Sequence, residues 1–183
     1  ASRHSEMQEP NKTHGIGLLQ FATVRDFIGD FPKLEAGQIH PDDHWHRCPT
    51  LSERNLERIK STPEGGDRRH WESHLINECH KKHTGHMDTY GRMSWDKPAP
   101  TLTTRCYSYS NGRFGHPDTN QHRAISVREA SRLQTFPQDF IFKGSVVEAS
   151  RQIGNAVPCE MAKQFGLSIL KHYDEVKNNN GKD

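Results

Sequence analysis

Apolar residues recur at helical spacing in the last quarter of the chain. Met161, Phe165 and Ile169 occupy positions i, i+4 and i+8, and Tyr173 continues the series. This spacing places the four side chains on one face of a helix. Proline is favoured in the first turn of a helix, where its missing N–H costs nothing, so we expect Pro158 to be the first residue of this helix.

Polar residues predict the starts of three earlier helices. Thr23 is suited to cap a short helix over residues 24–28. Residues 50–53 (TLSE) and 126–129 (SVRE) have capping-box spacing, in which a hydroxyl and a carboxylate bind free amides at the start of a helix. The helix after the first box would turn three apolar side chains inward, namely Leu51, Leu56 and Ile59. The helix after the second box would end near Thr135.

The remaining pattern is less regular. Residues 100–105 (PTLTTR) alternate and are rich in β-branched side chains, which predicts a strand. Residues 31–49 and 107–117 are rich in turn-forming residues and predict loops. Residues 67–93 show no clean period, so we expect irregular structure there.

Composition favours a loop-rich chain whose core is small or completed by a partner. Only 31% of the 183 residues are hydrophobic, and the formal net charge is +2. Residues 44–123 hold 13 Lys/Arg against 9 Asp/Glu, together with 9 of the 13 histidines. A basic, histidine-rich segment fits contact with a polyanion, although a solvated mixed surface also fits so mild an excess.

The lack of a recognisable targeting signal and the wide spacing of the cysteines predict an intracellular, cytoplasmic protein. The sequence has no apolar run long enough for a membrane span and no signal-peptide pattern. Its four cysteines are widely spaced, which indicates reduced thiols.

Histidines and cysteines raise the possibility of a zinc site. Cys79 and His83 could combine with His46 from the cluster around residues 44–48 to supply ligands of the type that zinc binds. The spacing matches no strong zinc template, and a solvated histidine-rich loop explains the same residues.

Two C-terminal blocks carry a more specific signal. Residues 123–137 fit the pattern R-x-x-S-x-R-E-A-x-R-L-Q-T-F-P, and residues 152–158 read Q-I-G-N-A-V-P. Alone, each block is an ordinary capped helix or turn. Together, in this order and followed by a helix, they resemble the last two signature motifs of the DNA cytosine-5 methyltransferases, and the likeness extends over about residues 23–173.

The resemblance implies where the chain meets its cofactor. In that family the last motif lies beside the S-adenosylmethionine pocket, so Asn155, Ala156 and Val157 are the residues expected to touch the cofactor. Four further positions are expected to support the two motifs structurally: Arg128, Glu129, Gln134 and Gly154.

The resemblance also implies contact with double-stranded DNA. The family reads the major groove with the variable segment, here about residues 31–122, and the first candidate is residues 105–116, which we call the DNA-contact loop. Base edges give specificity and phosphates give affinity. The expected contacts are Arg105, Tyr107, Asn111, Arg113 and His116. A surface hairpin without DNA contact is the alternative.

The chain lacks the motifs that the family's chemistry requires. Methylation of cytosine C5 needs a thiolate that attacks C6 of a flipped base and an acid near N3. The family supplies them in Pro-Cys-Gln and Glu-Asn-Val strings and binds cofactor through Phe-x-Gly-x-Gly, and none of these strings occurs here. Cys159 follows a proline, but its place inside the last motif indicates a structural cysteine.

We therefore expect the C-terminal part of a methyltransferase, inactive without an N-terminal catalytic half on the same longer chain or on a separate subunit. The predicted class is α/β: a small, mixed, loop-rich target-recognition domain plus the C-terminal turn and helix of a Rossmann-like methyltransferase domain. The expected divisions are a tail and connector (1–22), the recognition region (23–140), the closing motif and helix (141–175) and a disordered tail (176–183). A stand-alone DNA-binding module without catalysis is the alternative function, and a zinc nuclease would leave both blocks unexplained.

Overall fold

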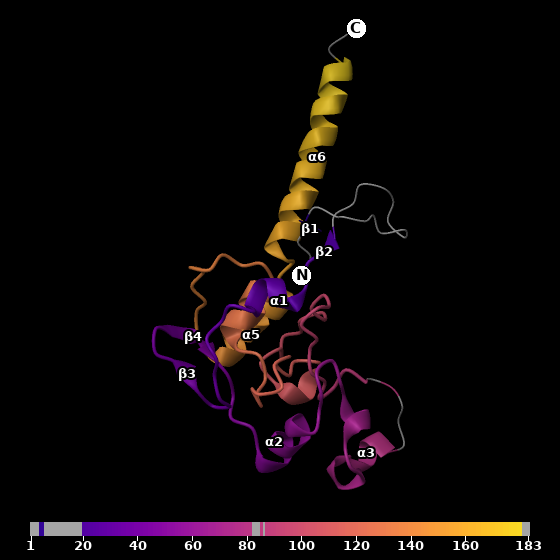
Figure 1. Ribbon diagram of the computed structural model, residues 1–183. Coiled ribbons are helices and arrows are strands. Elements are labelled where there is room, and N and C mark those ends of the chain that lie inside the picture. Colours follow the sequence, from indigo (N-terminus) through magenta and orange to yellow (C-terminus); the bar gives the residue numbers. More distant parts are fainter. Residues whose placement is uncertain (1–3, 6–19, 82–84, 86, 181–183) are drawn as a thin grey trace.

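The computed structural model describes residues 4–5, 20–81, 85 and 87–180 (Figure 1). Its helices are α1 (Val24–Ile28), α2 (Glu53–Lys60), α3 (Glu78–Lys81), α4 (Val127–Leu133), α5 (Val146–Asn155) and α6 (Cys159–Asn180). Short 3-10 turns lie at Arg68–His70, Ser73–Leu75 and Tyr109–Asn111. The described strands form two antiparallel pairs, β1 (His4–Ser5) with β2 (Gln20–Phe21) and β3 (Ile39–His40) with β4 (Asp43–Arg47).

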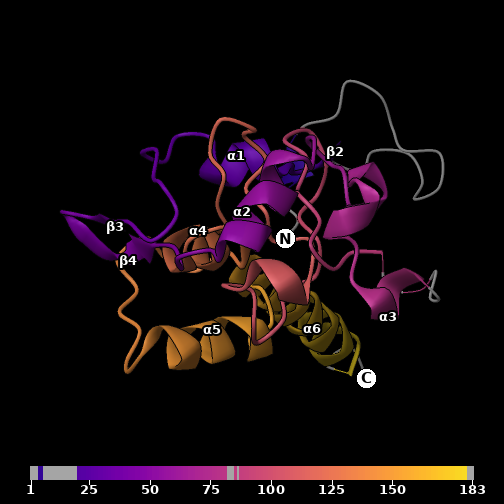
Figure 2. The ribbon, with the colours of Figure 1, turned by 90° about the horizontal axis from the view of Figure 1, so that it is seen from below.

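Helix α4 lies at the centre of the main apolar core. It packs against α1, β4 and α5, and α1 and α5 lie on opposite sides of it when the molecule is viewed from below (Figure 2). The core joins Val24 and Ile28 of α1 to Ala130 and Leu133 of α4, and Ile153 of α5 reaches the same cluster. Segments from both ends of the described chain therefore meet on one short helix.

Buried arginine replaces much of the hydrogen bonding that a larger sheet would supply. Arg92 is fully buried, and its guanidinium donates to the backbone carbonyls of Ile59, Thr62 and His116 at 2.6–2.9 Å. Buried carbonyls need a donor, and five N–H groups in a planar fork can serve several at once. Arg92 therefore ties α2 to the loop before α4.

Local capping signals predicted two helices well. The predicted helix over residues 24–28 is confirmed as α1, capped by Thr23. The box at Ser126 is confirmed as the start of α4, with both reciprocal hydrogen bonds present. The box at Thr50 is wrong by two residues, because Ser52 caps α2 by accepting from the amide of Asn55.

Several sequence predictions need correction. Residues 100–105 lie in coil and turn rather than in a strand, and residues 31–49 hold the β3–β4 hairpin in what was expected to be loop. Helix α5 replaces the simple turn expected before the last helix. The tail expected from residue 176 is helical up to Asn180, and residues 181–183 lie outside the described part of the chain, as does most of the expected tail and connector 1–22.

Helix α6 extends away from the rest of the molecule (Figure 1). Pro158 directly precedes it, and its carbonyl accepts a hydrogen bond from Ala162. The predicted apolar face is confirmed as exposed, with Phe165 61% and Ile169 69% accessible. Within the described residues, no helix is long and apolar enough to cross a membrane. The fold is thus a small mixed α/β arrangement of helices, loops and two-stranded sheets.

Candidate functional site

The two C-terminal sequence blocks are joined by hydrogen bonds in the structure. Gln134, at the end of α4, is buried, and its side-chain Nε2 donates to the carbonyls of Ile153 at 2.9 Å and Ala156 at 3.1 Å. Its own carbonyl accepts from the amide of Cys159 at 3.2 Å. The end of α4 therefore binds both the end of α5 and the start of α6.

Residues 155–157, which we call the cofactor-edge turn, face outward from this junction. Asn155 is exposed at the end of α5, Val157 is 57% accessible, and Ala156 is partly covered. Asn155 also lines an open depression of about 430 Å³ along α5 with five other residues: Lys143, Gly144, Glu148, Arg151 and Gln152. An exposed amide beside an exposed apolar side chain suits a ligand that has both polar and apolar parts.

Gly154, which directly precedes this turn, lies very close to residues 103 and 104, which directly precede the DNA-contact loop. A Cβ atom added there would lie 2.3 Å from the carbonyl carbon of Thr103 and from the amide nitrogen of Thr104. Contacts that short do not occur between a real Cβ and a backbone, so only glycine fits. The backbone beside Arg105 thus rests directly on the turn that carries Asn155.

Four of the five residues predicted to contact DNA are at least partly accessible. Arg105 and Asn111 are exposed, and Tyr107 and Arg113 are partly exposed. The loop that carries them is held from inside by Tyr109, which is buried and whose hydroxyl lies 3.2 Å from the hydroxyl of Thr62. An arginine, an aromatic ring and an amide on a braced loop form a surface able to meet phosphates and base edges.

The partly exposed Arg113 and the buried His116 make polar contacts within the protein, although both were predicted to contact DNA. The guanidinium of Arg113 donates to the carbonyls of Gly65 at 2.7 Å and Gly66 at 2.9 Å, and it forms ion pairs with Asp67 and Asp88. His116 is buried, and burial lowers its pKa to about 4. Both residues therefore brace the loop.

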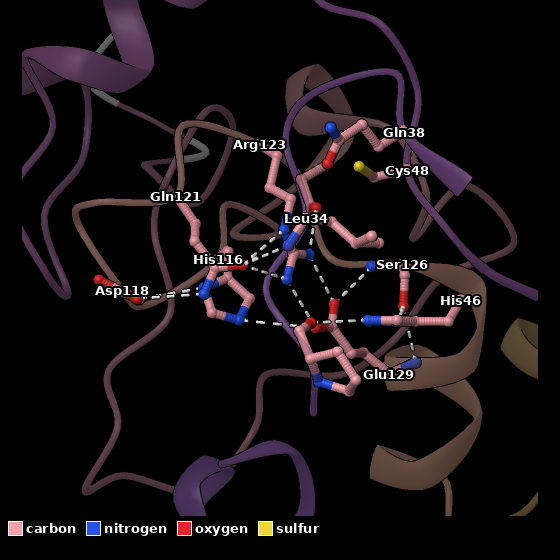
Figure 3. Close-up of polar contacts among 12 residues, drawn as sticks. Leu34, Gln38, His46, Cys48, His116, Asp118, Gln121, Arg123, Ser126 and Glu129 are labelled. Atoms are coloured by element: carbon pink, nitrogen blue, oxygen red, sulfur yellow. Dashed lines mark hydrogen bonds and ion pairs between the residues drawn. The ribbon is translucent and has the colours of Figure 1, made fainter. Parts of the chain in front are cut away.

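A buried ion pair links the segment that follows this loop to α4 (Figure 3). Arg123 and Glu129 are fully buried, and two guanidinium nitrogens each lie 2.8 Å from a carboxylate oxygen. The amide of Ser126 donates to the same carboxylate at 2.6 Å. Burial would raise the pKa of Glu129, but the charge and hydrogen bonds of Arg123 outweigh it and hold the pKa at about 2.

His46 completes the network from β4. Its Nε2 lies 2.8 Å from the carbonyl of Pro32, an acceptor, so this nitrogen carries the proton. Its Nδ1 then accepts from the Ser126 hydroxyl at 2.9 Å, and that hydroxyl accepts from the amide of Glu129. Burial lowers the pKa of His46, which favours this neutral form.

Arg128 fastens the β3–β4 hairpin to α4. Its Nε and Nη2 donate to the two carboxylate oxygens of Asp43 at 2.6 and 3.2 Å, and Nη1 donates to the carbonyl of Phe140. Two parallel bonds fix orientation as well as distance. Arg128 thus connects α4 both to the hairpin and to the segment that follows Gln134.

The predicted zinc ligands do not assemble in the described part of the chain. Both ring nitrogens of His46 are in use, Cys79 is exposed on α3, and His83 lies outside the described residues. Helix α3 and strand β4 lie on opposite sides of the molecule (Figures 1 and 2). Among the residues that the structure describes, no group of three or more His, Cys, Asp or Glu side chains could hold a metal ion.

Comparison with known proteins decides the family. The model of the C-5 cytosine-specific DNA methylase family matches residues 2–171. The chain belongs to this family. Cytosine-5 DNA methylases use S-adenosylmethionine as cofactor.

Curated cytosine-5 methylases align with most of the chain. It is 46% identical over 157 residues to the Type II methylase M.HgiDII of Herpetosiphon aurantiacus, with 82% of this chain and 44% of that protein covered. It is 32% identical over 169 residues to the Type II methyltransferase M1.HphI of Haemophilus parahaemolyticus, covering 91% of the chain and 40% of the relative. It is 34% identical over 174 residues to DNA (cytosine-5)-methyltransferase 3 of Arabidopsis thaliana, covering 80% and 12%. The chain thus spans less than half the length of these relatives.

Two features of the site were not predicted from the sequence. Thr135 binds the amide of Glu160 through its hydroxyl at 3.0 Å, and the depression beside Asn155 is lined by the unpredicted helix α5. The Ser145–Glu148 capping box that starts α5 has the same spacing as the one at Ser126, so a local signal for that helix was present.

Proposed function

We propose that this chain is the DNA-recognition and closing part of a DNA cytosine-5 methyltransferase. It supplies sequence recognition through the DNA-contact loop and one edge of the S-adenosylmethionine site through the cofactor-edge turn. The observation that carries the proposal is the contact at Gly154, where a Cβ would lie 2.3 Å from the Thr103–Thr104 backbone. That contact supports the proposal, because it brings the backbone before the DNA-contact loop against the glycine before the cofactor-edge turn.

On the DNA side, Arg105, Tyr107 and Asn111 are the contact residues. Their exposure leaves a guanidinium, a phenol and an amide available to phosphates or to base edges in the major groove. Arg113 and His116 support the loop from inside, so their part in recognition is to fix its shape. A braced loop loses less conformational entropy when it binds.

On the cofactor side, Asn155 and Val157 are the contact residues. S-adenosylmethionine supplies the methyl group when it is bound. The amide of Asn155 can hydrogen-bond polar groups of such a ligand, and Val157 offers an apolar surface for its flat ring system. Both side chains are exposed at the end of α5, which suits one edge of a pocket whose other walls come from another segment.

The catalytic half is the proposed partner. Attack on cytosine C6 requires a thiolate, and the family's nucleophile string is absent from the sequence. Cys159 lies half-buried at the start of α6, with its amide bound to the carbonyl of Gln134, and its role is structural. The apolar face of α6 is the surface on which we place the missing half.

Reconstitution tests the proposal. The chain is mixed with a polypeptide that carries the Phe-x-Gly-x-Gly and Pro-Cys-Gln motifs of the same enzyme, and transfer of labelled methyl groups from S-adenosylmethionine to duplex DNA is measured. Methylation that requires both polypeptides is the expected result. DNA binding without methylation by the mixture would favour the stand-alone binding module, and failure to bind either DNA or the other half would refute the proposal.

A matched pair of variants tests the recognition loop. Arg105→Ala should weaken DNA binding about tenfold or more, because a good arginine contact to a base contributes about 1–3 kcal/mol. Lys60→Ala removes the same charge from the exposed end of α2 and serves as the control. Equal losses of DNA affinity in the two variants would show that Arg105 contributes only as one of many surface charges.

A further inference from the structure

We propose that Gln134 is a positioning residue for S-adenosylmethionine: it sets the place of the cofactor-edge turn without touching the cofactor. This inference rests on the proposed function for its cofactor. The structural claim, that Gln134 fixes the turn, concerns this chain alone.

The side chain of Gln134 binds the carbonyls at the end of α5. The last carbonyls of a helix have no partner within the helix and need an outside donor. The Nε2 of Gln134 donates to Ile153 at 2.9 Å and to Ala156 at 3.1 Å. The carbonyls of Ile153 and Ala156 lie on either side of Gly154 and Asn155 in the sequence. The side-chain amide of Gln134 therefore fixes the backbone that carries the exposed Asn155 side chain.

The backbone beside Gln134 binds the start of α6. The carbonyl of Gln134 accepts from the amide of Cys159, and the Thr135 hydroxyl accepts from the amide of Glu160 at 3.0 Å. Thr135 has a φ of 60°, which a β-branched residue rarely adopts. Strain of this kind persists where surrounding structure fixes it and is often found at functional sites.

Residues 134–135 therefore hold both ends of the cofactor-edge turn from its inner side. The opposite side stays open, where Asn155 and Val157 face outward. Gln134 itself is only 7% accessible, so it acts through the turn. Its helix, α4, is anchored by the buried Glu129–Arg123 pair, and the amide of His116 in the DNA-contact loop donates to the carbonyl of Arg123 at 2.9 Å. Loss of the Gln134 amide should consequently displace the cofactor edge while the DNA-contact loop keeps its support.

The test uses Gln134→Met, which keeps length and volume but removes the donor. The matched control is Gln138→Met, the same change at an exposed residue four positions later. In the chain alone, amide hydrogen exchange at Ala156, Cys159 and Glu160 should accelerate by about tenfold or more in Gln134→Met, the factor that follows from the loss of one buried hydrogen bond. The control should exchange like the wild type.

The second readout is the kinetics of the reconstituted enzyme. The KM for S-adenosylmethionine should rise about tenfold in Gln134→Met, while kcat and the KM for DNA stay within about twofold. Equal changes in all three constants would indicate a general structural role and overturn the inference. Unaltered amide exchange would also overturn it, whatever the activity. An inactive wild-type mixture would refute the proposed function, whereas the exchange experiment would still decide whether Gln134 holds the turn.

Discussion

Some arginines of this chain are exposed, and others are buried and bind groups of the protein itself. The sequence alone does not show which arginine is of which kind. Arg105 is exposed, whereas Arg92 and Arg123 are fully buried and bind carbonyls and a carboxylate. Arg113 was predicted to contact DNA because it lies in a glycine-bearing loop, yet its Nη1 donates to the carbonyls of Gly65 and Gly66, and its Nε and Nη2 donate to Asp88 and Asp67. Which arginines are buried depends on loop paths that local sequence does not fix.

Gly154 gives the sharpest prediction at the residue scale. Gly154→Ala places a Cβ against the Thr103–Thr104 backbone at 2.3 Å, so the two segments must separate. We expect a loss of about 1–3 kcal/mol in the free energy of unfolding, the usual range for overpacking. Urea denaturation measures it.

The control for that substitution is Gly166→Ala in α6, where an added Cβ meets nothing within 4 Å. Alanine is the better helix former by about 1 kcal/mol, so this variant should be as stable as the wild type or more stable. Equal stability of Gly154→Ala and the wild type would contradict the tight contact and remove its support for the proposed function.

His116 predicts how stability depends on pH. Burial lowers its pKa in the folded chain to about 4, from an ordinary value of 6.5, and the charged groups around it are Glu129, Arg123, Asp118 and Arg92. Below pH 6.5 the unfolded chain takes up a proton that the folded chain does not, so stability falls as the pH drops towards 4. The loss is on the order of 3 kcal/mol.

Glu129 extends this acid sensitivity. Its folded pKa of about 2 lies below the ordinary 4.5, so its stabilising contribution is complete above pH 4.5 and is lost as the pH falls towards 2.

Urea unfolding tests the His116 prediction. Urea midpoints measured at pH 7, 5.5 and 4.5 should decrease with pH in the wild type and decrease less in His116→Gln. A wild type equally stable at the three pH values would show that the pKa of His116 is the same in the folded and unfolded chains and would contradict the prediction.

At the scale of elements, the two capping boxes before α4 and α5 offer a matched comparison. Ser145 is exposed and caps α5, so Ser145→Ala should cost about 1 kcal/mol. Ser126 is buried and also donates to Nδ1 of His46. Ser126→Ala should cost roughly 2–3 kcal/mol, because a buried ring nitrogen also loses its partner.

Thermal or urea unfolding of both variants gives the two costs. Which variant loses more stability matters more than the size of either loss, because both substitutions remove the same hydroxyl from the same helix position. A larger loss from Ser145→Ala would mean that the His46–Ser126 contact adds nothing to the stability of α4.

Local signals predicted the elements that depend only on neighbouring residues. Helices α1 and α4 follow from their caps. The strand at residues 100–105 was wrong for an instructive reason: Leu102 is buried between exposed Thr101 and Thr103, so the burial alternates as expected. A strand also needs a neighbour to pair with, and these residues instead turn, with Cys106 donating to Thr103. Pairing partners lie far away in sequence and leave no local trace.

At the scale of the whole molecule, the family could be inferred from sequence, whereas the site geometry could not. The motifs at residues 123–137 and 152–158 indicated the family that the comparisons establish. The hydrogen bonds of Gln134 across the two motifs required the structure, because they depend on how α4, α5 and α6 meet. The Rossmann-like domain that α6 would join remains part of the proposal.

The apolar face of α6 carries the last prediction. Phe165 and Ile169 lie one turn apart and are 61% and 69% accessible. Burial of each such side chain against a partner contributes about 1.5–3 kcal/mol, so removing both should weaken assembly with the catalytic half by about a hundredfold or more. The variant is the double substitution Phe165→Glu and Ile169→Glu, and the measurement is the concentration of chain that gives half-maximal methyl transfer.

Folding of the chain itself should not change in this variant, because α6 extends from the body (Figure 1) and both side chains are largely exposed. Its urea midpoint should match the wild type, which separates lost assembly from lost structure. Gln164→Glu, an exposed neighbour that receives the same carboxylate, is the control and should assemble normally. If the double variant assembled as tightly as this control, the face of α6 could not be the docking surface, and the catalytic half would have to bind through the α5 depression or the exposed loop around Ile141 instead.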